Sequence, residues 1–101
     1  MNRNQMQMIQ QMQNRMLKMQ EELGEQTVKS TAGGGAVKVE VSGHQEVRSI
    51  TINKEVVDPE DVETLQDLVL VAVNDGLRKS QELAQQKMAG VTGNLKIPGI
   101  M

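Results

Sequence analysis

Six basic side chains, carried by two segments with helical sequence patterns, are the residues of this 101-residue chain best suited to a chemical role. Arg15 and Lys18 are three residues apart, so they lie on one face of a helix. Side chains of this type contact the phosphates of a nucleic-acid duplex without reading its bases. The sequence therefore predicts that phosphate contacts come from Arg3, Arg15, Lys18, Arg78, Lys79 and Lys87.

The charges are unevenly distributed along the chain. Residues 1–20 carry three bases and no acid, and residues 76–101 carry four bases and one acid. Residues 21–75 carry four bases against twelve acids. Two basic ends around an acidic middle are typical of a polyanion site that the net charge of −2 conceals. The same distribution also fits charges scattered over solvated faces, so that alternative stays open.

The composition argues against most other chemistries. The chain has no cysteine and one histidine, which excludes thiol nucleophiles, zinc–thiolate sites and a histidine-rich metal site within one chain. It has no Phe, Tyr or Trp, the rings on which single-strand binders stack bases. The GGGAV stretch lacks the Gly-Lys-Ser/Thr ending of a phosphate loop, and His44 has no evident catalytic companion. We expect no enzyme activity, cofactor, metal or small-molecule substrate.

Methionine is concentrated in the stretch MQMIQQMQNRMLKMQEEL, residues 6–23. Thioethers can bind copper(I), but here the apolar residues follow the 3-4-3-4 spacing of a helix that packs on another helix. Methionine is an adaptable filler of such contacts, and the Gln-rich polar face does not fit a membrane-surface helix. We expect residues 1–24 to form a helix that pairs with the last helix or a second subunit. The seam consists of Ile9, Met12, Met16, Met19 and Leu23.

Residues 25–57 carry the pattern of a three-stranded antiparallel meander. Val28 marks a short edge strand, and the second strand alternates valine with polar residues. The short links AGGG and SGHQ join the strands. In the third strand the apolar positions shift from odd to even numbers, which predicts a bulge or a residue on the other face. The apolar positions of the last two strands are Val37, Val39, Val41, Val47, Ile50 and Ile52.

Residues 58–90 are predicted to form one long helix, followed by a Gly/Pro tail over residues 91–101. Asp58 suits the helix cap, and Pro59 suits the first helical position. An apolar stripe then continues to about residue 89. These elements predict an α+β fold, a two-layer α-β-β-β-α unit in one domain spanning residues 1–101. The first helix and the far end of the last helix would form an arm beyond the sheet.

Three stretches of the chain resemble the YbaB/EbfC family of nucleoid-associated proteins. They are GGGAVKVEVSGHQEVRSITIN, VVDPEDVETLQDLVLVAVNDGLRKSQELAQQKM and TGNLKIPGIM. The similarity covers nearly the full chain, including the Met/Gln-rich first segment. One departure is Gly76, where the family pattern leads us to expect alanine. Glycine costs roughly 1 kcal/mol of helix propensity at that position and is consistent with a bend.

The resemblance implies a homodimer joined through its α+β bodies, with helical arms that project like tweezers. It also implies binding to double-stranded DNA with little or limited sequence preference, in the cytoplasm and nucleoid, and a role in nucleoid organisation or gene regulation. It implies no enzyme activity. The six predicted contact residues come from the charge pattern, because the resemblance assigns no DNA-contact motif.

A second hypothesis uses the same elements differently. Met-rich helical arms on a β body would also suit a protein-interaction clamp or holdase, and the overall acidic charge weakens non-specific DNA binding. Binding by such a clamp would depend on the methionine seam and little on salt. No signal-peptide pattern and no stretch of about 20 apolar residues is present, so we expect neither secretion nor a membrane span.

Overall fold

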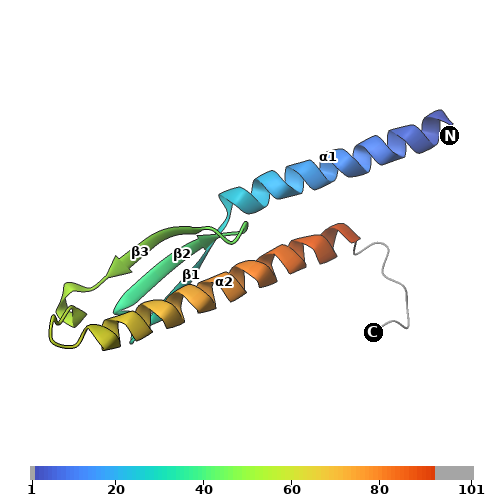
Figure 1. Ribbon diagram of the computed structural model, residues 1–101. Coiled ribbons are helices and arrows are strands. Elements are labelled where there is room, and N and C mark those ends of the chain that lie inside the picture. The colour runs from blue at the N-terminus through green and yellow to red at the C-terminus, as the bar shows by residue number, and fades with distance from the viewer. Residues whose placement is uncertain (1, 93–101) are drawn as a thin grey trace, which may run out of the picture.

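The computed structural model describes residues 2–92, which form an elongated α+β molecule of 69 × 30 × 16 Å (Figure 1). A long helix lies at each end of this region and three strands lie between them, which confirms the predicted fold class. The elements are α1 (Arg3–Glu25), β1 (Thr27–Ala32), β2 (Val37–Ser42), β3 (Val47–Ile52), the short 3₁₀ helix η1 (Lys54–Val56) and α2 (Val62–Thr92).

The three strands form an antiparallel meander in the order β1-β2-β3. Gly33, Gly34 and Gly35 all have positive φ angles, which explains the glycine run between β1 and β2. The predicted bulge is confirmed. Glu40 pairs with Ser49 and Val41 pairs with Val47, so Arg48 is the extra residue of β3.

The start of α2 differs from the sequence-based prediction. Asp58 closes a turn, in which its carboxylate accepts a hydrogen bond from the Glu60 amide at 2.9 Å. Asp61 caps the helix instead, because its carboxylate accepts from the Thr64 amide at 3.4 Å and from the Thr64 hydroxyl at 2.6 Å. Both aspartates are good caps, and the turn before the helix selects the second. At its other end α2 continues to Thr92, past the predicted end at residue 90. The remainder of the predicted tail, 93–101, lies outside the described residues.

The core lies between α2 and one face of β1 and β2. Val37, Val39 and Val41 are fully buried there, as their alternation with polar residues predicts. α2 meets them with small side chains at every fourth position, and this spacing keeps one narrow face of the helix against the sheet. These positions are Ala72, Gly76 and Ser80, all buried.

Strand β3 lies beyond the cover that α2 provides. All six of its residues are exposed. Ile50 and Ile52 pair with Val39 and Val37, so they lie on the same face of the sheet as the buried valines. Yet 45% of Ile50 and 39% of Ile52 are accessible to solvent, because α2 packs on β1 and β2. The apolar face of the sheet is therefore only partly covered within one chain.

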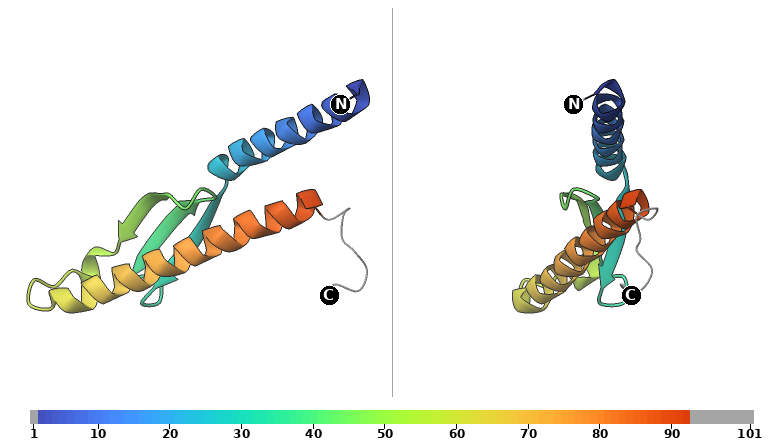
Figure 2. Two further views of the ribbon diagram at one scale, coloured as in Figure 1. Left: turned by 45° about the vertical axis from the view of Figure 1, so that its right-hand side comes forward. Right: turned by 90° about the vertical axis from the view of Figure 1, so that its right-hand side faces the viewer.

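Helix α1 projects from the end of the sheet on the same side as the second half of α2 (Figures 1 and 2). Met19 and Leu23 are buried at the base of α1. The outer members of the predicted seam, Ile9, Met12 and Met16, are exposed instead. Pairing of α1 with α2 along the whole seam is therefore wrong for the single chain. Only the last two turns of α1 reach the body, and the outer turns extend past it.

Gly76 provides a test of how closely α2 approaches the sheet. A Cβ at this position would lie 2.7 Å from Cγ2 of Val41, closer than packed atoms approach. Alanine gains about 1 kcal/mol of helix propensity, while overpacking in a core costs about 1–3 kcal/mol. We expect Gly76→Ala to lower the free energy of unfolding by about 1 kcal/mol in urea denaturation.

The matched comparison places Gly76→Ala in a Val41→Ala background. There the obstructing methyl groups are gone, so alanine at position 76 should raise the free energy of unfolding. A stabilising Gly76→Ala in the otherwise unchanged protein would contradict the close contact.

Candidate nucleic-acid interface

The six predicted contact residues fall into two groups in the structure. The first three lie on α1 and are all exposed, and we call them the arm bases: Arg3, Arg15 and Lys18. The other three lie on α2 and we call them the α2 bases: Arg78, Lys79 and Lys87. The two groups differ in their partners within the chain.

The arm bases lie on one side of α1. An α-helix turns by about 100° per residue, so the three side chains fall within a sector of about 120° around the axis of α1. The centre of this sector lies about 140° around the axis from the centre of the methionine seam. Within residues 2–92 none of the three forms an ion pair. The first acid of α1 is Glu21, so the outer turns carry uncompensated positive charge. Such a surface can attract phosphate groups without first giving up an intramolecular partner.

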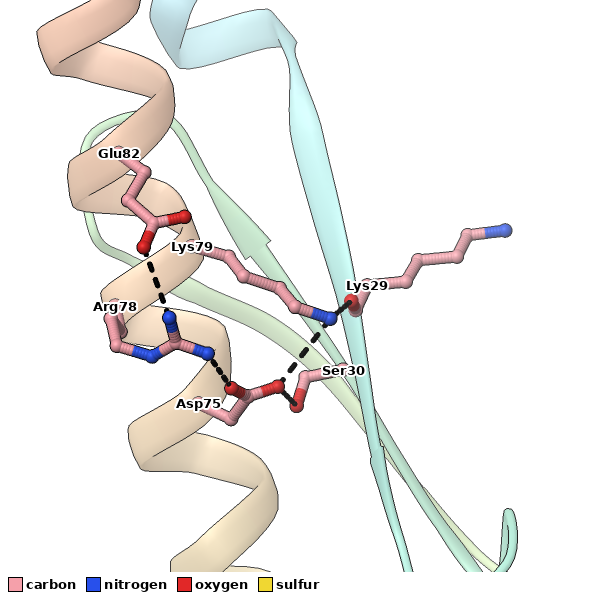
Figure 3. A network of polar contacts seen from close by, with 6 residues as sticks. All are labelled: Lys29, Ser30, Asp75, Arg78, Lys79 and Glu82. Carbon is pink, nitrogen blue, oxygen red and sulfur yellow. Dashed lines mark hydrogen bonds and ion pairs between the residues drawn. The ribbon is translucent and has the colours of Figure 1, made fainter.

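Two of the α2 bases belong to a network around Asp75 (Figure 3). Arg78 donates to the Asp75 carboxylate with one nitrogen and to Glu82 Oε1 with the other, the latter at 3.0 Å. Lys79 Nζ lies 3.4 Å from the other Asp75 oxygen and donates to the carbonyl of Lys29 at 3.2 Å. The i,i+3 and i,i+4 spacings place these charges on one face of α2. Both bases are thus partly neutralised before any ligand arrives.

Asp75 holds this network together electrostatically. The hydrogen bond from Arg78, followed by the hydrogen bond from Ser30 and the charge of Lys79, lowers the pKa of Asp75 to about 2. The same contact with Asp75 raises the pKa of Arg78. Ser30 Oγ lies 2.9 Å from Asp75 Oδ2, so the network also ties α2 to β1. Its first role is structural.

The third α2 base, Lys87, lies 3.7 Å from Glu22 of α1. This ion pair bridges the two helices where they leave the body of the molecule. Both side chains are partly exposed, so solvent screens the pair and its net contribution to stability is small. The structure therefore brings Lys87 to the base of α1, as the predicted arm required, but next to an acid.

Other basic residues lie outside the predicted set. Lys29 and Lys38 are exposed on the strands, with Lys29 paired to Glu40 at 3.8 Å. Lys29 and Lys38 alternate with more buried residues along their strands, and this alternation indicates that both side chains point away from the core. Arg48 lies at the bulge and contacts the carbonyl of Gly24, a pairing across 24 residues that sequence spacing does not reveal. His44 similarly reaches the Gln20 carbonyl at 2.6 Å.

The described residues present no cluster of three or more histidine or acidic side chains arranged to hold a metal ion. Over the same part of the chain, no helix combines the length and apolar character needed to span a bilayer. The candidate site is the charged surface formed by the arm bases of α1 and the α2 bases.

These features define an elongated α+β protein with a basic helical arm. The chain belongs to the YbaB/EbfC DNA-binding family, whose family model matches residues 1–95. It is 58% identical over 95 residues to a nucleoid-associated protein of Pelotomaculum thermopropionicum, covering 94% of this chain and 90% of the relative. It is 62% identical over 91 residues to a nucleoid-associated protein of Chloroflexus aurantiacus, covering 90% and 91%.

A solved structure shares this fold. The crystal structure of the uncharacterized protein HP0035 from Helicobacter pylori matches with a TM-score of 0.79. The match covers 92% of this chain and 99% of that protein, at 24% sequence identity. At this identity the likeness supports the fold alone.

The network around Asp75 can be tested by titration. We expect the Asp75 carboxyl to titrate near pH 2 in ¹³C NMR, and Arg78→Gln to raise this pKa toward the ordinary value of 3.8, because the Arg78 hydrogen bond is the largest cause of the shift. A lowered carboxylate pKa stabilises the fold above the unfolded-state pKa. That contribution is lost as the pH falls through the folded-state pKa, so it should disappear between about pH 4 and pH 2.

Lys87→Gln removes the same charge without touching Asp75 and serves as the control. An unchanged Asp75 pKa in Arg78→Gln would show that Arg78 does not hold the carboxylate.

Proposed function

We propose that this protein is a nucleoid-associated protein that binds duplex DNA as a homodimer, with little sequence preference, and contributes to nucleoid organisation or gene regulation. Membership of the YbaB/EbfC DNA-binding family and the names of the relatives support DNA as the partner. The observation that carries the site is the face of α1 with three bases and no ion pair among the described residues. No enzymatic step is part of this proposal.

The arm bases are the main phosphate contacts in this proposal, and the α2 bases are secondary. A phosphate that binds Arg78 or Lys79 must compete with Asp75, and one that binds Lys87 must compete with Glu22. The arm bases face no such competition within the described chain. Contacts to phosphates alone would also explain weak sequence preference, since phosphates carry no base information.

Two triple variants, each replacing the three bases of one group by uncharged glutamine, test this ranking of the arm bases over the α2 bases. We expect the arm variant Arg3→Gln/Arg15→Gln/Lys18→Gln to lose more affinity for a labelled random-sequence duplex than Arg78→Gln/Lys79→Gln/Lys87→Gln. The log–log slope of affinity against salt should become shallower by about 0.9 for each lost phosphate contact. Fluorescence anisotropy at several salt concentrations measures both quantities.

The control Lys29→Gln/Lys38→Gln/Lys54→Gln makes the same change in net charge on the sheet and η1. Equal losses in all three variants would show that only net charge matters and that the site assignment is wrong. No binding of the unchanged protein at low salt would refute DNA binding of this kind.

The uncovered part of the sheet supports the homodimer. Val47, Ile50 and Ile52 are all exposed, with Ile50 and Ile52 on the apolar face and β3 at the edge of the sheet. A chain of this size buries only about two-thirds of its unfolded surface, so covering this face would add stability. We place the interface between two copies on β3 and the adjacent flank of α2.

A charge on the apolar face of β3 should disrupt this interface. We expect Ile50→Asp/Ile52→Asp to convert the dimer to a monomer in analytical ultracentrifugation, because a carboxylate buried without a partner is costly. Ser49→Asp/Thr51→Asp places the same two charges on the opposite face of the same strand and should leave the dimer intact. A dimer that persists in the double variant would move the interface elsewhere.

One observation favours the protein-interaction clamp as a second candidate. Ile9, Met12, Met16 and Leu17 are exposed together on α1, with Leu17 64% accessible, and such apolar surfaces on a helix commonly receive a partner. Two assays on one variant, DNA binding and capture of unfolded polypeptide, distinguish the two functions. Met12→Gln/Met16→Gln leaves the arm bases in place, so DNA affinity should be retained if DNA is the partner. Capture of unfolded polypeptide that is lost in this variant, without DNA binding by the unchanged protein, would favour the clamp.

A further inference from the structure

The attachment of α1 to the rest of the molecule is confined to its last turns. Every residue from position 3 to 18 is exposed, and only Met19 and Leu23 are buried, at 4% and 3% accessibility. The outer turns of α1 thus have no side-chain packing that could set their direction. The direction of the whole helix depends on what holds its C-terminal end.

The β2–β3 hairpin holds that end by three hydrogen bonds to main-chain carbonyls, two from the link between the strands and one from β3. His44 Nε2 lies 2.6 Å from the carbonyl oxygen of Gln20 and donates to it in the Nε2-protonated form. The amide of Gly43 donates to Leu23 at 2.9 Å, and Arg48 donates to Gly24 at 3.4 Å. The last four carbonyls of a helix have no partner within the helix, so groups outside it, here Gly43 and Arg48, can satisfy those of Leu23 and Gly24. The Gln20 carbonyl lies just before that last turn, and His44 adds a contact to it. Here the outside groups all belong to one hairpin.

The two glycines at this contact show how closely the hairpin and helix approach. A Cβ on Gly43 would lie 2.4 Å from the main-chain oxygen of Leu23. A Cβ on Gly24 would lie 2.9 Å from Cε1 of His44. Gly43 also has a φ angle outside the positive range, so the lack of a side chain, not backbone freedom, is what the contact requires.

The bulge in β3 contributes directly to this contact. Arg48 is the residue without a partner on β2, and bulges redirect the side chain that they carry. Its guanidinium reaches Gly24 with Nη2, while Nη1 lies 3.4 Å from Glu46. Without the bulge, the Arg48 side chain would follow the regular alternation of β3 side chains between the two faces of the sheet.

We propose that the β2–β3 hairpin is a rigid joint that fixes the direction of α1, with His44 and Arg48 as the positioning residues. The consequence for DNA rests on the proposed function. From Leu23 to Arg3, α1 is about 30 Å long, so a tilt of about 20° at the joint moves its tip by about 10 Å. The grooves of B-DNA are about 6 and 12 Å wide. A tilt of this size therefore carries an arm base from one phosphate strand across a groove.

The joint differs from an ordinary helix cap in what it controls. A cap stabilises the helix end, and its loss changes the free energy of unfolding. A joint additionally sets the distance between α1 and the sheet. The test must therefore measure that distance and not only stability.

The chain contains no cysteine, so two spin labels can be placed at chosen sites. Gln10→Cys on α1 and Thr31→Cys on β1 are both exposed positions away from the joint. Pulsed electron paramagnetic resonance on full-length protein, with labelled chains diluted about tenfold into unlabelled protein to isolate distances within one chain, gives the distribution of arm positions. We expect one narrow main peak for the unchanged joint, above any broad background from chains whose outer turns are transiently unwound.

His44→Ala/Arg48→Ala should broaden this distribution at least twofold, while circular dichroism shows the fold retained. The conservative variant His44→Gln/Arg48→Lys keeps a donor at both positions and should restore most of the narrow distribution. Ser49→Ala, in the same strand, is the matched control and should change nothing. With the arm no longer held in place, affinity for duplex DNA should fall on the order of tenfold, because ordering the arm then costs free energy on binding.

An unchanged distance distribution in His44→Ala/Arg48→Ala would overturn the proposal that the hairpin fixes the direction of α1. A broadened distribution with unchanged DNA affinity overturns the positioning role of these residues. If the unchanged protein binds no DNA, the proposed function fails, and the distance distribution alone decides whether the hairpin fixes α1.

Discussion

The close contact of α2 with β1 and β2 is the constraint on which the rest of the structure depends. The chain has no Phe, Tyr or Trp, and the centre of the core is thin, because the valines of β2 lie opposite small residues of α2. Partly buried leucines and valines of α2 pack around this centre. Gly76 allows α2 to approach Val41, and Ser80 Oγ donates to the Ser42 carbonyl at 2.6 Å and accepts from the Gln45 amide at 3.1 Å. The helix thereby fixes the start of the β2–β3 link. Since that link contacts α1, the position of α2 is transmitted to the arm.

The same contact explains what the fold leaves uncovered. One narrow face of α2 lies over two strands, and this leaves the third strand with exposed isoleucines on its apolar face. A larger side chain at Gly76 would lift the helix and weaken the core before it could cover β3. The thin core and the exposed edge strand therefore both result from the small residues on the sheet-facing side of α2. In our proposal, a second copy of the chain covers that edge strand.

Much of this architecture could be predicted from the sequence because it follows from local periodicity. The alternating valines of β2 predict a half-buried strand, and the shift between Val47 and Ile50 predicts the bulge. Local sequence places the cap of α2 three residues too early, because Asp58 and Asp61 are equally good capping residues. The pattern of α1 predicts a seam that packs on α2 or on a second subunit, because periodicity reveals an apolar face but not what covers it. Contacts such as His44 with Gln20 join residues 24 positions apart and leave no local pattern.

The candidate site shows the same division between local and tertiary information. The basic residues are visible in the sequence, and so are the i,i+3 and i,i+4 acids that pair with Arg78. The pairing of Lys87 with Glu22 is not visible, because it depends on how α1 meets α2. Position in the fold therefore ranks charges that sequence alone treats as equal.

The sparse packing of α1 has a consequence for its own helical structure. Its outer turns, residues 3–18, depend on intrinsic propensity and on the Asn2 cap, whose Oδ1 accepts from the Gln5 amide at 2.9 Å. Isolated helices of this length are only marginally stable in water, so these turns unwind locally far more readily than the core does. Any ligand that orders the outer turns must supply the free energy to keep them helical. Binding at the arm is thereby linked to a helix–coil equilibrium, and substitutions that change helix propensity will alter affinity without touching the ligand.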